Sequence, residues 1–160
     1  VKYHTSGRLK VAPEHTEEHV LRLMRKPSFE MFERMNSRFN TICRREGLKY
    51  QLIPYFISSH PGCEERDMRA LADKVLGKLH FNLEQVQDLT PTPMTLSSVM
   101  FYMGENPYDG KEIYVARSQD DKRRQKSYFF GGQLPDDRSK TKGDVTKRKG
   151  QTPRRKPQRR

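Results

Sequence analysis

Residues 50–58 (YQLIPYFIS) constrain the fold more than any other stretch, because they form an almost continuous apolar run. A run of this kind predicts a parallel strand that helices cover on both faces. Pro54 interrupts the pattern, since proline has no N–H to donate to a neighbouring strand and favours edges or bulges. We therefore expect a buried parallel strand with an irregularity at Pro54.

Helices and further strands alternate with this run. A strand is predicted at residues 9–12, and a helix over about 17–25 has Thr16 as its cap. A second helix follows Ser28 and ends at Gly47. The remaining expected elements are a helix over about 63–79, a strand at 81–88, a helix from Pro93 to Tyr102 with Thr92 as its cap, a strand at 111–116 and a helix at 120–130. This order predicts an α/β fold with a parallel sheet and right-handed crossovers.

The basic character of the chain is concentrated near its end. Residues 1–118 carry 17 Lys and Arg against 15 Asp and Glu, whereas residues 119–160 carry 15 against 5. Residues 133–160 contain almost no apolar side chain, so we expect a disordered basic tail. Nonspecific binding of RNA or acidic partners through this tail is the alternative function, although it lacks the aromatic side chains that stack on bases.

Cysteine content and hydropathy indicate the cellular setting. Cys43 and Cys63 are the only cysteines, too few for a disulfide framework. No stretch approaches the roughly 20 apolar residues of a membrane span. We expect a cytoplasmic protein with no membrane contact. The chain begins at Val1 close to a strand, which favours the later part of a longer protein.

Polar side chains follow each of the three expected strands. Because carboxyl ends of parallel strands meet at one edge of a sheet, a shared pocket is expected there. The candidate residues are Glu14, His15, Ser58, His60, Gln85, Gln87 and Thr92.

Two further motifs lie at this edge. His15-Thr-Glu-Glu-His19 matches the H-x-x-E-H zinc pattern, but His15 precedes the helix cap, so the two histidines would not share a helical face. No metal ligand is therefore assigned. Cys63 opens a helix, a position that binds anions and lowers a thiol pKa, although a turn that merely packs fits equally well.

Three stretches resemble the C-terminal half of a YgiQ-type radical SAM protein. They are residues 9–27 (LKVAPEHTEEHVLRLMRKP), 50–62 (YQLIPYFISSHPG) and 83–95 (LEQVQDLTPTPMT). The resemblance implies strands four to six of a partial (β/α)6 barrel over residues 1–104, a family-specific extension over 105–132 and the tail over 133–160.

The same resemblance implies cofactors. Such enzymes bind a 4Fe–4S cluster through C-x3-C-x2-C and reduce S-adenosylmethionine, with the strand-end residues named above facing cofactor or substrate. This sequence has no C-x3-C-x2-C, so the cluster-binding half would lie upstream or be lost. The chain alone should not cleave S-adenosylmethionine, and neither its substrate nor a catalytic residue is assigned.

Overall fold

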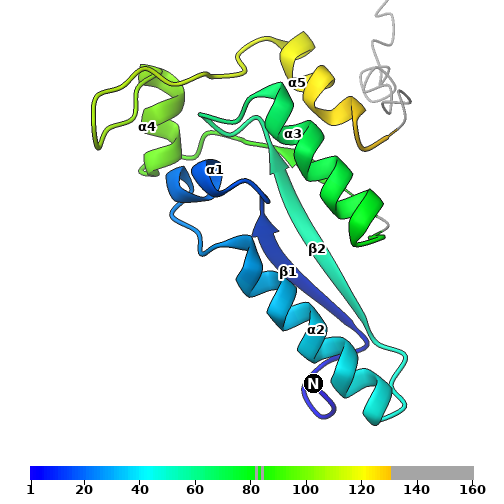
Figure 1. Cartoon of the computed structure of the whole chain (residues 1–160). Coiled ribbons are helices and arrows are strands. Elements are labelled where there is room, and N and C mark those ends of the chain that lie inside the picture. Colours follow the sequence, from blue (N-terminus) through cyan, green and yellow to red (C-terminus); the bar gives the residue numbers. More distant parts are fainter. Residues whose placement is uncertain (82, 84, 131–160) are drawn as a thin grey trace, which may run out of the picture.

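Three parallel strands form the sheet in a computed structural model that describes residues 1–81, 83 and 85–130. They are β1 (Arg8–Glu14), β2 (Gln51–Ser58) and β3 (Val86–Asp88), in the order β1-β2-β3 (Figure 1). Arg8 pairs with Gln51, and Phe56 pairs with Val86. The parallel sheet predicted from the sequence is therefore confirmed.

Helices connect the strands as the alternation predicts. α1 (Glu18–Leu23) and α2 (Phe29–Arg45) lie between β1 and β2. α3 (Glu65–Ala72) continues into a π-helical segment, η1 (Asp73–Lys78), before β3. α4 (Leu96–Met103) and α5 (Gln119–Ser127) follow the sheet, and α5 lies beside α3 (Figure 1).

The sheet is buried on one face, and the expectation that helices cover both faces is wrong. Side chains alternate along β2, so that Leu52, Pro54, Phe56 and Ser58 are buried while Gln51 is exposed. The buried side packs against both α2 and α3 in one core. Its other main members are Phe29, Phe32, Phe39, Met68, Leu71 and Val75.

We call the opposite side the open face. Strand register places on it Lys10, Gln51, Ile53, Tyr55, Ile57 and Gln87. Gln51 and Gln87 are exposed, and the apolar members are only half-buried. Because β2 is apolar throughout but covered on one face only, its other apolar side chains are partly exposed to water. Exposed apolar patches of this kind usually mark a surface that binds another element or partner.

Pro54 fits the middle strand because half of β2 has no second neighbour among the described residues. Gln51 N donates to Gly7 O, and Leu89 N donates to Ser58 O, so even-numbered residues of β2 direct their backbone toward β3. β3 pairs only from Phe56 onward. The missing N–H of Pro54 therefore faces the unpaired part of the edge, where it breaks no ladder bond.

Three predicted elements differ from the structure. Of the described residues in the strand expected at 81–88, only Val86–Asp88 form a strand. The expected strand at 111–116 is a single antiparallel bridge between Glu105 and Glu112. Met94 has a left-handed φ of 66°, so α4 begins only at Leu96 and Thr95, not Thr92, caps it.

The first helix also begins later than expected, with Glu17 rather than Thr16 as its cap. It ends at Leu23, and Arg25 has a φ of 56°. No helix in the described ranges is long and apolar enough to cross a membrane. The predicted disordered tail at 133–160 lies outside the described residues.

Candidate functional site

The turns that follow β1 and β2 are built alike. Glu14 and Ser59 have left-handed φ angles of 66° and 61°, and each precedes a buried histidine, His15 or His60. A left-handed backbone costs a residue with a Cβ roughly 1–2 kcal/mol. Strain of this kind is retained where surrounding contacts enforce it, often at functional sites. Both turns lie at the edge where the sequence predicts a pocket.

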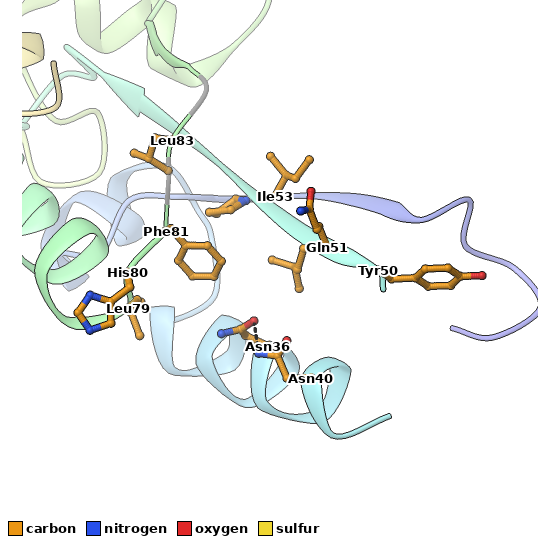
Figure 2. A pocket seen from close by; sticks show the side chains of 11 residues that line it. Asn36, Asn40, Tyr50, Gln51, Ile53, Leu79, His80, Phe81 and Leu83 are labelled. Atoms are coloured by element: carbon orange, nitrogen blue, oxygen red, sulfur yellow. Dashed lines mark hydrogen bonds between the residues drawn. The ribbon is translucent and has the colours of Figure 1, made fainter. Parts of the chain in front are cut away.

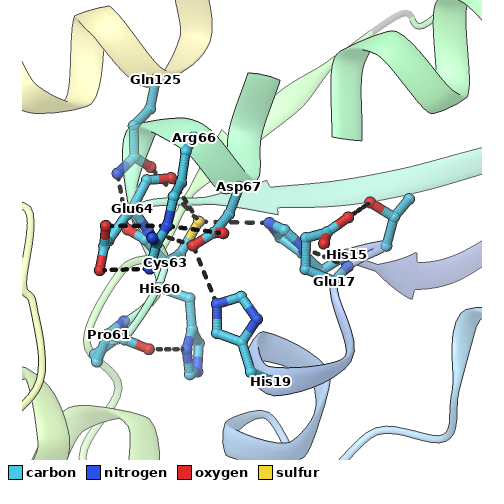
Figure 3. Close-up of polar contacts among 11 residues, drawn as sticks. His15, Glu17, His19, His60, Pro61, Cys63, Glu64, Arg66, Asp67 and Gln125 are labelled. Carbon is cyan, nitrogen blue, oxygen red and sulfur yellow. Dashed lines mark hydrogen bonds and ion pairs between the residues drawn. The ribbon is translucent and has the colours of Figure 1, made fainter. Parts of the chain in front are cut away.

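His15 links the first turn to the second. Its Nδ1 accepts a hydrogen bond from Glu17 N at 3.0 Å, so the proton of the neutral ring is on Nε2. That Nε2 lies 3.4 Å from Cys63 Sγ and donates to it (Figure 3). Burial lowers the pKa of His15 to about 3, although nearby Asp67 opposes the shift. The imidazole is therefore neutral near pH 7.

Cys63 is a protonated, buried thiol. Burial raises its pKa, and the charges of Asp67, Glu64 and Glu17 add to the effect. The expectation that the helix N-terminus lowers this pKa is wrong, because burial beside carboxylates outweighs the helix dipole. Since His15 Nε2 donates to sulfur rather than accepting from it, this pair is a structural contact and not a nucleophile with its base.

His60 links the second turn to α4. Its Nδ1 donates to Pro61 O at 2.8 Å, which leaves Nε2 to accept from Ser97 Oγ at 2.8 Å. Burial lowers the pKa of His60, whereas the bond to Pro61 O opposes the change. The two histidines thus connect the turn after β1, the turn after β2 and the start of α4.

Close packing also fixes the second turn. Gly62 has a φ of 81°, and a Cβ at this position would lie 2.2 Å from Leu23 Cδ1 of α1. A larger residue would have to move the Leu23 side chain and would be strained by the positive φ, so the position favours glycine. The turn is therefore bounded by Leu23 of α1 on one side, and it is held by His60 within it and by His15 from the first turn.

The end of β3 joins the same edge through a charged contact. Ser58 Oγ donates to Asp88 Oδ1 at 2.7 Å, and Lys126 Nζ of α5 lies 2.6 Å from Asp88 Oδ2. Gln87, the preceding residue, lies on the open face and is exposed.

The structure brings together four of the seven candidates. Glu14, His15, Ser58 and His60 lie at the carboxyl ends of β1 and β2. Glu14 pairs with Lys26 at 2.9 Å, and the other three side chains are buried and hydrogen-bonded within the protein. Gln85 precedes β3 and Thr92 is exposed in the following loop, so neither joins this group.

The two cavities described next are lined by other residues, although Lys26, the partner of Glu14, lines the smaller one. One of about 570 Å³ opens between α2, the first half of β2 and the segment after η1 (Figure 2). Asn36 and Asn40 of α2 line it, joined by a hydrogen bond of 3.1 Å. A smaller one, about 140 Å³, lies between β1 and the start of α2. None of the seven candidates lines either cavity.

The two histidines of the zinc pattern point to different partners. His19 Nε2 lies 3.1 Å from Asp67 Oδ2, whereas His15 Nε2 faces Cys63 (Figure 3). Among the described residues, no three His, Cys, Asp or Glu side chains are grouped so that they could hold a metal ion.

Gln125 of α5 is a site residue that sequence reasoning missed. It is 1% exposed, accepts from Ser59 N at 2.8 Å and donates to Cys63 O at 3.0 Å. The surrounding sequence, QDDKRRQKS, is charged throughout, so periodicity gives no sign that one glutamine faces inward. The pattern of α5 alone therefore does not reveal its contact with the turn.

Ser59→Gly is expected to raise the free energy of unfolding by about 1 kcal/mol. Glycine adopts the left-handed conformation without strain, and the buried Ser59 hydroxyl finds no hydrogen-bond partner among the described residues. Chemical denaturation measures the change. The matched control, Ser58→Ala, should instead lose about 1 kcal/mol because it removes the bond to Asp88. A loss of stability in Ser59→Gly would show that its hydroxyl is used.

Comparison with known proteins finds relatives named UPF0313 protein. Those of Bacteroides thetaiotaomicron and Porphyromonas gingivalis are each 55% identical over 127 residues, which are 79% of this chain and 20% of each relative. One from Methanocella arvoryzae is 46% identical over 122 residues, 76% of this chain and 20% of the relative. The chain thus spans about a fifth of the length of these curated relatives. No protein-family model matches it.

Proposed function

We propose that this chain is a segment of a UPF0313 protein and forms one wall of a radical SAM barrel. The relatives that it matches are UPF0313 proteins, and the match covers only a fifth of each of them. The resemblance in residues 9–27, 50–62 and 83–95 supplies the enzyme class. The substrate-facing wall would be the open face together with the strand-end turns.

The one-sided sheet is the observation that carries this proposal. In a closed or partly closed barrel, helices cover the outside of the strands and the inner face lines the lumen. Here α2 and α3 pack on the same side, and the open face carries Ile53, Tyr55 and Ile57. A sheet wound on both sides would instead place these helices on opposite faces.

Exposed apolar side chains on α4 support a larger assembly. Val99, Tyr102 and Met103 are exposed on this helix, and Met94 just before it is fully exposed. In the proposed protein, another part of the same polypeptide covers them. β1 likewise has a strand neighbour on one edge only, within the described part of the chain.

The residues present do not fit the iron–sulfur cluster. Cys43 faces the core from α2, Cys63 is held by His15 in the second turn, and a 4Fe–4S cluster takes three or four thiolates at one point. The cluster ligands would therefore come from elsewhere in the polypeptide. The open face could contribute apolar and amide contacts to S-adenosylmethionine through Tyr55, Ile57 and Gln87.

The experiment compares the longer polypeptide that contains this sequence with the 160-residue chain. After anaerobic reconstitution with iron and sulfide, the longer protein with a reductant should convert S-adenosylmethionine to 5′-deoxyadenosine, which chromatography measures. The chain alone should form none. An intact longer reading frame without C-x3-C-x2-C, or a reconstituted protein that leaves S-adenosylmethionine uncleaved, would contradict the proposal.

The alternative function remains the binding of RNA or acidic partners by the basic tail. It rests on the excess of Lys and Arg over Asp and Glu in residues 119–160. The tail itself, residues 133–160, lies outside the described residues. Cytoplasmic location likewise stays a prediction.

A further inference from the structure

Gln125 bridges the two ends of the turn after β2. Its side-chain oxygen accepts from the N–H of Ser59, the left-handed residue. Its amide nitrogen donates to the carbonyl of Cys63, beside which Figure 3 draws it. The same oxygen lies 4.0 Å from Cys63 Sγ. One amide thus pairs with the backbone at both ends of a five-residue turn, and it is itself almost completely buried.

α5 and the two residues after it are anchored around this contact. Lys126 pairs with Asp88 at the end of β3, and Tyr128 donates to Glu65 of α3 at 2.6 Å. Phe129 joins the hydrophobic core. These anchors place the glutamine between β2, β3 and α3. Both polar atoms of its side chain form hydrogen bonds to the turn after β2.

We propose that Gln125 is a positioning residue for this edge of the sheet. Its two hydrogen bonds hold the turn after β2 in its left-handed conformation and thereby maintain the contact between His15 and Cys63. We call this pairing of Gln125 with the turn the latch. The latch explains how Ser59 holds a φ of 61° although it is not glycine. It goes beyond the proposed function, since it applies to any ligand that this edge binds.

The two cysteines supply a native test. Cys63 lies in the latched turn, whereas Cys43 is buried in α2 and reports on opening of the core. In Gln125→Ala, reaction of Cys63 with a dipyridyl disulfide should become at least about tenfold faster relative to Cys43, because two buried hydrogen bonds are lost. Mass spectrometry of the digested protein measures both rates. The matched control is Arg123→Ala, on the exposed side of α5, which should leave the ratio unchanged.

An unchanged ratio of the Cys63 rate to the Cys43 rate would overturn the latch. This holds if neither rate changes, and also if both rates rise equally through general destabilisation.

A second variant, Gln125→Glu, keeps the shape and changes the donor. At pH 8 the introduced carboxylate can still accept from Ser59 N, but it has no proton to donate to the Cys63 carbonyl. The reaction rate of Cys63 divided by that of Cys43 should therefore exceed the wild-type value. At pH 5 protonation restores the donor, and the excess should shrink. The nearby titratable groups are common to both proteins, so wild type at each pH is the reference; they are His15, Glu17, Glu64, Glu65, Asp67 and Tyr114. No excess at pH 8 would mean that Gln125 only fills space, and an excess that does not change with pH would mean that the lost donor to the Cys63 carbonyl is not its cause; either result would overturn the proposal.

Discussion

Phe56→Ala is expected to lower the free energy of unfolding by about 3–5 kcal/mol, measured by chemical denaturation. Phe56 is fully buried in the middle strand, pairs with Val86 and lies with its ring 6.4 Å from that of Phe29. Its removal leaves a cavity where α2, α3 and the sheet meet. A loss of this size is comparable to the whole stability of a marginal domain, so the variant should be largely unfolded under mild conditions.

The matched control is the neighbouring residue on the opposite side of the strand. Tyr55→Ala removes an aromatic ring from the open face, where its side chain is only half-buried, and should cost less than about 1 kcal/mol in this chain. Similar losses in the two variants would contradict the one-sided sheet. In a longer protein whose barrel covers the open face, the cost of Tyr55→Ala should rise.

Acidification is expected to destabilise the chain through His15. The folded pKa of His15 is about 3, against 6.5 for the free side chain, so the unfolded state binds a proton more readily. Stability from this group is complete above pH 6.5, falls as the pH drops and is lost by about pH 3. The shift corresponds to roughly 4–5 kcal/mol. His60, whose pKa is lowered too, changes stability in the same direction.

His15→Asn tests this assignment because asparagine can accept from Glu17 N but cannot become charged. At pH 7 the variant should be less stable than wild type, since it loses the contact with Cys63. Between pH 6.5 and 3 its free energy of unfolding should fall much less steeply. If wild type and variant show the same slope, the acid sensitivity belongs to other groups and the burial of His15 is not its cause.

Local sequence signals predicted most of the scaffold. The apolar run of β2 and the helical stripes of α2 and α3 identified those elements and their order, because burial and periodicity leave a direct mark on side-chain type. Cys43 of α2 packs in the core together with the apolar residues of that helix. The prediction that β2 is covered on both faces was wrong, because a strand with one open face and a strand covered on both faces can carry the same apolar residues.

The strand-end cluster was predictable in position but not in detail. Parallel topology implied that His15, Ser58 and His60 meet at one edge. Their partners depend on contacts between segments far apart in the chain. Cys63 acquires a raised pKa from burial and from carboxylates at the starts of α1 and α3, which no local pattern encodes. The inward side chain of Gln125 was hidden because α5 is held by single specific contacts rather than by an apolar stripe.

The contact between Gln125 and Ser59 also bears on the order of events during protein synthesis. The two residues are separated by 66 positions in the chain, so the turn after β2 cannot receive its final backbone bonds until α5 has left the ribosome. Until then Ser59 is free of the constraint that holds it left-handed. A nascent chain stalled before residue 125 should therefore show a folded α2 and β2 with a turn that proteases still cut.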